Sequence, residues 1–313
     1  MTAPVIAVVG ATAAGKSDLA IELALALGGE VVNADSMQLY RGMDIGTAKL
    51  TPAGQRGVPH HLLSVWDVRY PANVAEYQAM AQAVLTEVEA RGRVPVLAGG
   101  SGLYVRAALG DLDFPGTDPA VRQRLEDELA EAGPARLHTR LAAADPAAAA
   151  AILPSNGRRI VRALEVIEVS GRPFAAAMPA YEHKFPAVQL GLAVSRPELD
   201  QRIAARTERM WRDGFVAEVR ELARAGLREG RTASRALGYA QVLRFLAGEC
   251  TEEEAKAETI LATRRFARRQ EAWFRRDPRI TWLDAAGADL AGRALDTIEA
   301  CGSRRDTAPR TTS

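Results

Sequence analysis

A glycine-rich phosphate-binding pattern stands close to the N-terminus. It matches GxxxxGK[ST] in full and consists of Gly10, Ala11, Thr12, Ala13, Ala14, Gly15, Lys16 and Ser17. A short apolar run at residues 5–9 precedes it, and apolar residues at helical spacing follow it over residues 17–27. The pattern therefore has the context that it needs to bind phosphate, which is a loop between a buried strand and a helix.

The residue types of this loop suit a di- or triphosphate bound together with Mg²⁺. Glycines let backbone N–H groups face an anion, and the N-terminus of the following helix adds positive potential. The Lys16 ammonium can reach the outer phosphate oxygens, and the Ser17 hydroxyl can coordinate Mg²⁺. The loop alone does not identify the reaction, because many kinds of enzyme hold phosphates in this way.

Strand and helix patterns alternate along the first hundred residues. Apolar runs at residues 30–34 and 94–98 predict buried strands, and residues 74–91 predict a helix between them. This alternation predicts an α/β fold with a doubly wound parallel sheet. Residues 118–172 look wholly helical, and an apolar run at residues 189–194 returns to a strand pattern. The helical block is therefore expected to be an insertion into the α/β core.

These patterns define the expected domains. A catalytic core should comprise residues 1–114 and 187–285, and an inserted helical subdomain should comprise residues 115–186. Further helices are expected at residues 197–211, 216–225, 236–246 and 251–275, and a last short strand at residues 281–283. Residues 303–313 are polar and lack periodicity, so we expect a disordered tail there.

Composition is that of a soluble globular protein. Hydrophobic residues make up 48% of the 313 residues and charged residues 25%. The chain has no apolar run long enough to span a bilayer and no basic segment typical of a signal peptide at its start. Cys250 and Cys301 form no CxxC pair, which favours a reducing compartment. We therefore expect a cytoplasmic protein without membrane contact, whereas the net charge of +1 does not decide whether it binds nucleic acid.

Two polar residues follow predicted strands at the edge where a doubly wound sheet binds its ligands. Asp35 could act as a general base or a metal-associated ligand, or it could cap a turn or helix. Ser101 could cap a helix at residues 102–109, face the same crevice, or do both. The third strand ends in Gly-Gly-Ser, so the Walker-B aspartate of typical nucleoside triphosphatases is missing there.

Several longer segments resemble the tRNA dimethylallyltransferase (isopentenyltransferase) family. The narrowest match is ADSMQLYRGMDIGTAK at residues 34–49. It is accompanied by PHHLL at 59–63, GGSGLY at 99–104, RIVRALE at 159–165, LGY at 237–239 and TRRFARRQ at 263–270. Two positions depart from the family pattern: Ala11 replaces a common Pro, and Ser101 replaces a common Thr. The first should change only the stiffness of the loop, and the second keeps the hydroxyl.

This resemblance implies transfer of a dimethylallyl group from dimethylallyl diphosphate to N6 of adenosine 37 in tRNA, with release of diphosphate. It makes Asp35 the base that takes the N6 proton, and Ser101 a hydrogen-bonding partner of the same adenine region. The phosphate loop, with Mg²⁺ at Ser17, would neutralise the leaving diphosphate. One chain can build this site, so we expect a monomer.

The resemblance also implies contacts with the tRNA anticodon stem-loop, whose adenosine must leave its stack. The expected RNA-contacting residues are Asp35, Ser36, Met37, Gln38, Ser101, Arg122, Arg158, Arg159, Ile160, Val161, Arg162, Arg235, Gly238 and Tyr239. The inserted helices would grip the stem-loop. Residues 264–276 form a basic helix that could contact phosphates or pair with the glutamates before it, and we favour ion pairs. His60 and His61 lack cysteine partners and are expected to hold a loop or to pack.

Two other functions remain open from composition and spacing. In a small-molecule P-loop kinase, Asp35 would bind the acceptor hydroxyl, and the inserted helices with Arg158, Arg159 and Arg162 would form a lid. A non-catalytic RNA-binding ATPase is the third possibility, and the absent Walker-B aspartate counts against it. The segment at residues 34–49 favours the prenyltransferase, by resemblance.

Overall fold

The computed structural model describes residues 3–112, 116–174 and 184–306, which divide into two compact units. The core unit comprises Met1–Leu109 and His183–Ser313, and the helical unit comprises Gly110–Glu182. The helical unit thus begins and ends a few residues earlier than the 115–186 expected from the positions of the prolines.

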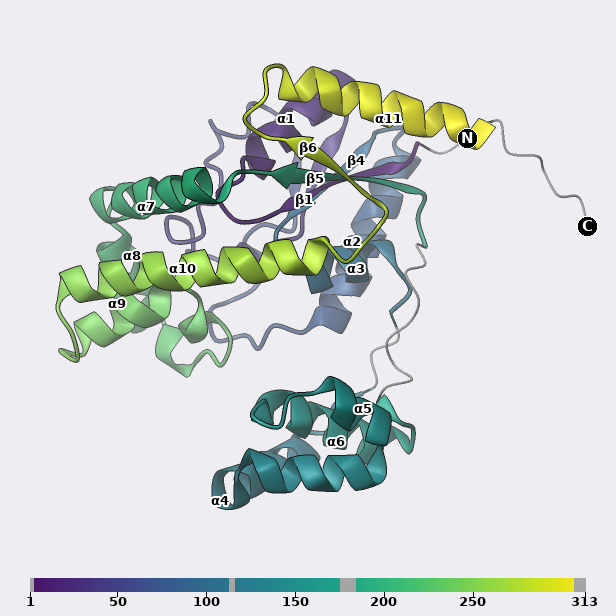
Figure 1. Ribbon diagram of the computed structural model, residues 1–313. Helices are drawn as coiled ribbons and strands as arrows, with labels where there is room; N and C mark the ends of the chain where they lie inside the picture. Colours follow the sequence, from purple (N-terminus) through teal and green to yellow (C-terminus); the bar gives the residue numbers. More distant parts are fainter. Residues whose placement is uncertain (1–2, 113–115, 175–183, 307–313) are drawn as a thin grey trace, which may run out of the picture. The chain divides into compact units, whose positions relative to one another are not determined.

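A parallel six-stranded sheet forms the centre of the core unit (Figure 1). Its strands are β1 (Val5–Gly10), β2 (Glu30–Asn33), β3 (His60–His61), β4 (Pro95–Gly99), β5 (Ala187–Ala193) and β6 (Ile280–Asp284). Their order across the sheet is β3-β2-β4-β1-β5-β6. β1 is buried along its whole length, as a strand with helices over both faces must be. The doubly wound α/β fold predicted from the sequence is confirmed.

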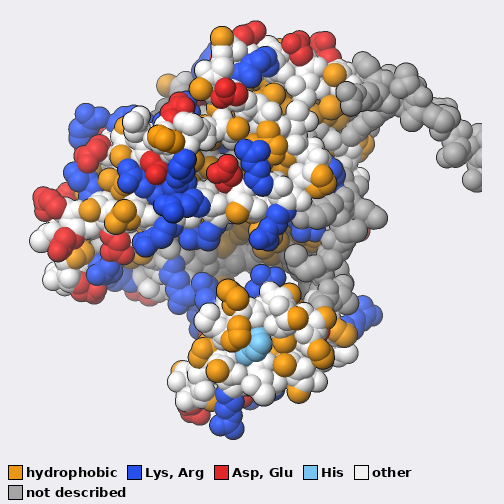
Figure 2. All heavy atoms as spheres, viewed as in Figure 1, with side chains coloured by type: hydrophobic (Ala, Val, Ile, Leu, Met, Phe, Trp, Pro, Cys, Tyr) orange, Lys and Arg blue, Asp and Glu red, His pale blue; other side chains and the backbone are white. Residues whose placement is uncertain are grey.

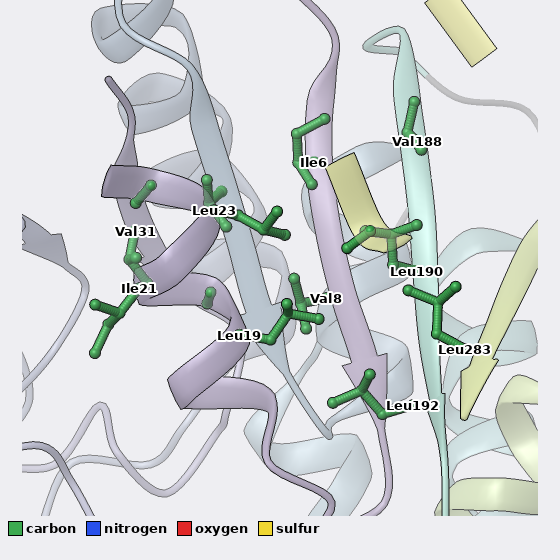
Figure 3. Close-up of a cluster of buried hydrophobic side chains, with 14 of the residues drawn as sticks. Ile6, Val8, Leu19, Ile21, Leu23, Val31, Val188, Leu190, Leu192 and Leu283 are labelled. Atoms are coloured by element: carbon green, nitrogen blue, oxygen red, sulfur yellow. The ribbon is translucent and has the colours of Figure 1, made fainter. Parts of the chain in front are cut away.

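Helices cover both faces of this sheet. On one face lie α1 (Lys16–Leu27) and α11 (Leu290–Asp306); on the other lie α2 (Val74–Ala90), α3 (Gly102–Leu109) and α10 (Glu252–Phe274) (Figure 1). Leu19 and Leu23 of α1 point towards Val8 and Leu190 in the main hydrophobic cluster (Figure 3). The remaining helices of the core unit include α7 (Arg196–Arg212), α8 (Phe215–Arg224) and α9 (Tyr239–Leu246). None of the helices within the described ranges is long and apolar enough to cross a membrane.

Two elements of the core unit differ from expectation. The predicted disordered tail was wrong for residues 303–306, because they belong to α11; residues 307–313 lie outside the described residues. Leu290, Leu295 and Ile298 pack against the main hydrophobic cluster, and this burial holds the helix on the sheet. β3 was also missed, because a strand of two residues carries no readable periodicity.

In its described residues, the helical unit contains α4 (Pro119–Ala144), α5 (Pro146–Ala151) and α6 (Gly157–Ser170). Its hydrophobic cluster is formed by leucines of α4 with the apolar face of α6, including Leu125, Leu141, Ile160 and Leu164. α4 is interrupted at Gly133, which directly precedes Pro134. The φ of Gly133 is 75°, which is not a helical value, so the helix is kinked there. The unit therefore has its own core, as a separate compact body requires.

The approach of β2 to β4 sets a strict size limit at Gly99. A Cβ atom at Gly99 would lie 2.2 Å from the carbonyl oxygen of Ala34, so the Gly99→Ala variant must move the backbone. We expect it to lower the free energy of unfolding by about 1–3 kcal/mol, measured by urea denaturation. Gly116→Ala is the matched control, because its Cβ would meet nothing closer than 3.9 Å. Equal unfolding midpoints for the two variants would contradict this account.

Candidate active site

The carboxyl ends of three neighbouring strands bring the sequence-predicted residues of the core unit together. β1 leads into the phosphate loop, β2 into Asp35, and β4 into Ser101, and these strands are adjacent in the order β2-β4-β1. Thr12, Asp35 and Ser101 line one cavity of about 340 Å³. The parallel sheet thus places a phosphate-binding loop, a carboxylate and a hydroxyl at one site.

The phosphate loop has the backbone that its sequence predicts. Gly10 and Gly15 have φ values of 141° and 95°, which a side chain would disfavour, and Ala13 also has a positive φ of 63°. Gly15 precedes the first residue of α1, Lys16, so the loop ends at a helix N-terminus. The positive end of α1 therefore stands where the phosphates of a ligand would bind.

Two cations lie at this loop. The Lys16 ammonium donates a hydrogen bond to the Ala11 carbonyl at 2.7 Å. Arg206 of α7 donates to the Thr12 hydroxyl at 3.2 Å and to the Thr47 carbonyl at 3.1 Å. Burial lowers the pKa of Lys16 to about 8, although nearby Asp35 opposes this shift and Arg206 adds to it. Burial likewise lowers the pKa of Arg206. Two desolvated positive charges facing one carboxylate leave a positive excess that favours a polyanionic ligand.

Arg206 was missed by the sequence analysis. It is one of several arginines in a helix rich in charged residues. Only the packing of α7 brings it to its partner Thr12, which lies 194 positions away in the sequence. No local motif distinguishes it from its neighbours.

A small polar recess adjoins the phosphate loop. Lys16, Ser17, Asn33 and Asp35 line it, and its volume is about 60 Å³. The Ser17 hydroxyl and the Asp35 carboxylate are hard oxygen donors of the kind that Mg²⁺ prefers. No cluster of three or more His, Cys, Asp or Glu side chains that could hold a metal occurs in the described residues. Mg²⁺ needs no such cluster when phosphate oxygens and water complete its coordination, so these residues fit the ion.

Asp35 is held in a hydrogen-bonded turn. Its backbone N–H donates to the Asn33 side chain at 2.9 Å, and its Oδ1 accepts from the Met37 N–H at 2.9 Å. Tyr77 of α2 donates its hydroxyl to the Asn33 carbonyl at 2.9 Å. Asp35 is thus a turn residue and a cavity residue together, so the two roles weighed from the sequence do not exclude each other. The turn fixes the carboxylate in place.

The Ser101 side chain bonds across the site, while its carbonyl accepts from the N–H groups of Tyr104 at 2.8 Å and Val105 at 3.0 Å at the start of α3. Its hydroxyl accepts from the Ser36 N–H at 3.2 Å and donates to the Ser36 hydroxyl at 3.2 Å. Met37 lines the large cavity with them, while Gln38 lines the small recess and donates to the Thr47 carbonyl at 3.1 Å. Residues 35–38 and Ser101 therefore form one hydrogen-bonded wall.

The opposite wall comes from the C-terminal helices of the core unit. Arg235, Gly238 and Tyr239 line the large cavity, as do apolar side chains including Ile203, Met210, Phe215, Leu237 and Phe266. Tyr239 donates to Glu218 of α8 at 2.6 Å, and Glu218 also accepts from the N–H groups of residues 44–46. Glu218, which the sequence analysis missed, thus ties the segment at residues 34–49 to this wall.

Gln270 of α10 joins two of the loops. It is buried, its Oε1 accepts from the Thr12 N–H at 2.9 Å, and its Nε2 donates to the Gly100 carbonyl at 2.8 Å. The phosphate loop and the loop that carries Ser101 are therefore held at a set spacing by one amide. Sequence reasoning placed Gln270 in a family-like segment but assigned it no role.

Four arginines of the helical unit were expected to contact RNA, and the structure separates them into two pairs. Arg122 and Arg162 both bond to Glu165, which is fully buried. Burial raises the pKa of Glu165, but hydrogen bonds from the two arginines outweigh it and hold the pKa below its usual value. Arg158 and Arg159 are exposed at the start of α6.

Ile160 and Val161 were also expected to contact RNA. Their side chains are buried in the hydrophobic cluster of the helical unit. The placement follows from helical spacing, because residues that follow exposed Arg158 and Arg159 by one or two positions turn towards the core.

Among the residues that the structure describes, the glutamates that precede the basic segment at residues 264–276 form no ion pair with its arginines. Glu254 caps α10 through Thr251, and Glu258 bonds to Arg244 of α9. Among the arginines, Arg264 lies near Asp200 of α7, and Arg275 lies near Glu271. The favoured ion pairs were therefore wrong, because α9 and α7 supply other partners.

His61 bonds to Glu30 at 2.7 Å and His60 to the Val58 carbonyl at 2.8 Å.

Comparison with known proteins agrees with this geometry. A model of the family described as IPP transferase matches residues 38–277. The chain belongs to the IPP transferase family. It is 69% identical to the tRNA dimethylallyltransferase of Thermobifida fusca over 94% of each chain, and 68% identical to that of Streptomyces avermitilis over 91% of this chain and 92% of the relative.

Solved structures of this family share the fold. The tRNA isopentenylpyrophosphate transferase of Bacillus halodurans superposes with a TM-score of 0.70 at 38% identity, over 97% of both chains. A eukaryotic dimethylallyltransferase acting on tRNA superposes with a TM-score of 0.80 at 24% identity, over all of this chain and 82% of the other. The second likeness concerns the fold alone.

The link through Gln270 predicts a measurable effect in this IPP transferase. Gln270→Leu leaves the Thr12 N–H and the Gly100 carbonyl without their partner and releases both loops. We expect unfolding free energy to fall by about 2–4 kcal/mol, and the affinity for inorganic diphosphate, measured by calorimetry below the unfolding transition, to fall. Gln201→Leu, at an exposed position of α7, is the control. Unchanged diphosphate affinity in Gln270→Leu would show that the link does not shape the loop.

Proposed function

We propose that this chain transfers the dimethylallyl group of dimethylallyl diphosphate to N6 of adenosine 37 in tRNA and releases diphosphate. One observation carries the proposal: Asp35 lines the same cavity and recess as a phosphate loop with two half-buried cations, Lys16 and Arg206. A base for the acceptor and an anion site for the donor would then act on two substrates held side by side. The names of the relatives support tRNA as acceptor.

The two ends of the donor suit two parts of the cavity. The diphosphate would bind the amides of the phosphate loop, Lys16 and Arg206, and the dimethylallyl group would lie against apolar side chains such as Ile203 and Phe215. These contacts place positive charge where the leaving group gains negative charge. The phosphate loop would thus stabilise a diphosphate that departs, whereas in a kinase it holds a phosphoryl group that is transferred.

Bond formation requires a proton acceptor at the adenosine. The N6 lone pair is delocalised into the ring, so the amine is a weak nucleophile. As the bond from N6 to C1 of the donor forms and the bond from C1 to the diphosphate oxygen breaks, Asp35 takes the N6 proton. Ser101 bonds to Ser36 beside it and orients the same region.

We propose that Mg²⁺ binds at Ser17 with the diphosphate. The ion would supply further positive charge to the leaving oxygens. Ser17 lines the recess beside the phosphate loop and offers an oxygen ligand.

RNA recognition would draw on both units. In the core unit, residues 35–38, Ser101, Arg235, Gly238 and Tyr239 would hold the adenosine after it leaves the stack. Of the four arginines of the helical unit that were expected to contact RNA, exposed Arg158 and Arg159 would bind phosphates, because Arg122 and Arg162 are bound to Glu165. All of these residues come from one chain, so we propose a monomer, which acts in the cytoplasm.

A transfer assay tests the proposed function. The protein is mixed with Mg²⁺, dimethylallyl diphosphate and an unmodified tRNA with A at positions 36 to 38, and nucleosides are read by mass spectrometry. We expect N6-dimethylallyl-adenosine, which is lost when position 37 is changed. No such product, together with ATP consumption in the presence of small acceptors, would instead assign a kinase.

Removal of the base should slow transfer without loss of RNA binding. Asp35→Asn keeps the size of the side chain but cannot accept the N6 proton, so we expect single-turnover transfer to fall about 10²–10⁴-fold. Binding of tRNA, followed by filter retention, should stay near the wild-type value. Asp67→Asn, at an exposed surface aspartate, is the control. A rate within threefold of wild type would remove Asp35 as the base.

Titration of Lys16 should appear in the pH profile. Its pKa of about 8 means that the ammonium is charged below this pH and neutral above it. We therefore expect kcat/KM for the donor to decline as pH rises through about 8, while a diphosphate remains fully ionised. Lys16→Ala should lower kcat/KM throughout and abolish this decline. A wild-type profile that is flat from pH 7 to 9.5 would contradict the assignment.

A further inference from the structure

One aromatic ring forms part of the inner wall of the large cavity. The Phe215 side chain lines the cavity although it is fully buried, so its ring faces inwards. On the face shown in Figure 2, Lys, Arg, Asp and Glu side chains are spread over the outer surface of α9 and α10. This apolar wall therefore faces the cavity and not the surrounding solvent.

Packing on several sides fixes the Phe215 ring. It makes edge-to-face contacts with Trp211, at 5.2 Å between ring centres, and with Tyr239, at 5.0 Å. A Cβ atom at Gly46 would lie 2.2 Å from the ring, so the backbone there contacts it directly. Tyr239 is itself held by the hydrogen bond from its hydroxyl to Glu218. The ring therefore has no room to turn aside for a ligand.

The cavity runs along α7 from the phosphate loop to this ring. Arg206, Thr207 and Met210 line it, and their spacing of one helical turn places them on one side of the helix. Arg206 bonds to the Thr12 hydroxyl of the phosphate loop, and Met210 lies about 6 Å further along the helix axis at about 1.5 Å per residue. Phe215 follows after the turn at the end of α7. An anion held at Arg206 can thus extend an apolar tail towards Phe215.

The cavity has space for a short tail only. Its volume of about 340 Å³ is at the low end of the range for a single small-molecule ligand. In the proposed reaction it must admit an adenine and a prenyl group together. Each further five-carbon prenyl unit lengthens the donor by about 5 Å, since C–C bonds are about 1.5 Å long. A second unit would therefore have to occupy the place of the Phe215 ring.

We propose that Phe215 limits the donor to a single five-carbon prenyl unit, so that its ring excludes geranyl diphosphate and longer prenyl diphosphates. The inference rests on the proposed function, because it assigns the residue that sets the chain length of the same donor. Met210 also lines the cavity, but it is partly exposed and has three rotatable bonds, so it can move aside. A fixed ring cannot, and its steric exclusion of a longer chain gives selectivity without added affinity for the short donor.

A competition between two donors tests this limit. Each protein receives equal concentrations of dimethylallyl diphosphate and geranyl diphosphate with Mg²⁺ and one unmodified tRNA. Mass spectrometry measures the ratio of N6-geranyl-adenosine to N6-dimethylallyl-adenosine, which reports the ratio of the two kcat/KM values. In both transfers the bond from N6 to C1 forms, the bond from C1 to the diphosphate oxygen breaks, and Asp35 takes the N6 proton.

We expect Phe215→Ala to raise the geranyl-to-dimethylallyl ratio about 100-fold, since one methylene in an apolar pocket already changes specificity about 10–200-fold. Phe215→Leu keeps more of the packing and should raise the ratio about tenfold, and it decides the test if Phe215→Ala does not fold. Phe245→Leu is the matched control, because Phe245 of α9 does not occur among the described residues of the cavity lining. Met210→Ala widens the same cavity and should change the ratio less than threefold.

Two results would overturn the inference. One is a folded Phe215→Leu protein whose product ratio equals that of the Phe245→Leu control. The other is a Met210→Ala ratio as high as that of Phe215→Ala, which would place the limit on α7 instead.

Failure of the proposed function gives a different result, because wild-type protein then forms no prenylated nucleoside from either donor. Calorimetric affinities for dimethylallyl and geranyl thio-diphosphates decide the inference in that case. A gain of about tenfold in affinity for the geranyl compound in Phe215→Leu, with no gain in Phe245→Leu, would support the limit at Phe215. Equal affinities in the two variants would overturn it.

Discussion

Two cations and one carboxylate lie close together at the carboxyl end of the parallel sheet. The other contacts of the site depend on this arrangement. Lys16 and Arg206 lie at the phosphate loop, and burial lowers the pKa of both. Asp35 is the carboxylate whose charge opposes these shifts. Such an arrangement is costly without an anion, so the site is prepared for a ligand that brings several negative charges.

Hydrogen bonds from distant parts of the chain maintain this arrangement. Gln270 spans from Thr12 to Gly100, Arg206 from Thr12 to Thr47, and Glu218 holds the N–H groups of residues 44–46. Each bond connects a C-terminal helix to a loop at the sheet edge. A donor site and an acceptor wall built on separate loops thereby keep a fixed spacing, which a transfer between two bound substrates requires.

Local patterns account for what could be predicted from the sequence. The strand, loop and helix around Lys16 carry their own signals, and the parallel sheet then places Asp35 and Ser101 at the same edge. Arg206 and Gln270 could not be assigned in this way, because their roles depend on contacts 194 and 258 residues apart in the sequence. The burial of Ile160 and the ion-pair partners of the α10 glutamates could not be predicted for the same reason. Both depend on which helices pack beside them. The end of α11 at Asp306 was not predicted, because residues 303–306 are polar and show no helical periodicity.

The most direct measurement is a crystal structure with a thio-diphosphate analogue of dimethylallyl diphosphate and an anticodon stem-loop. The account predicts that the diphosphate contacts Lys16, Arg206 and the phosphate-loop amides, with the adenosine N6 between C1 of the donor and the Asp35 carboxylate. A diphosphate bound away from Lys16 and Arg206, or an N6 atom beyond hydrogen-bonding reach of Asp35, would contradict it.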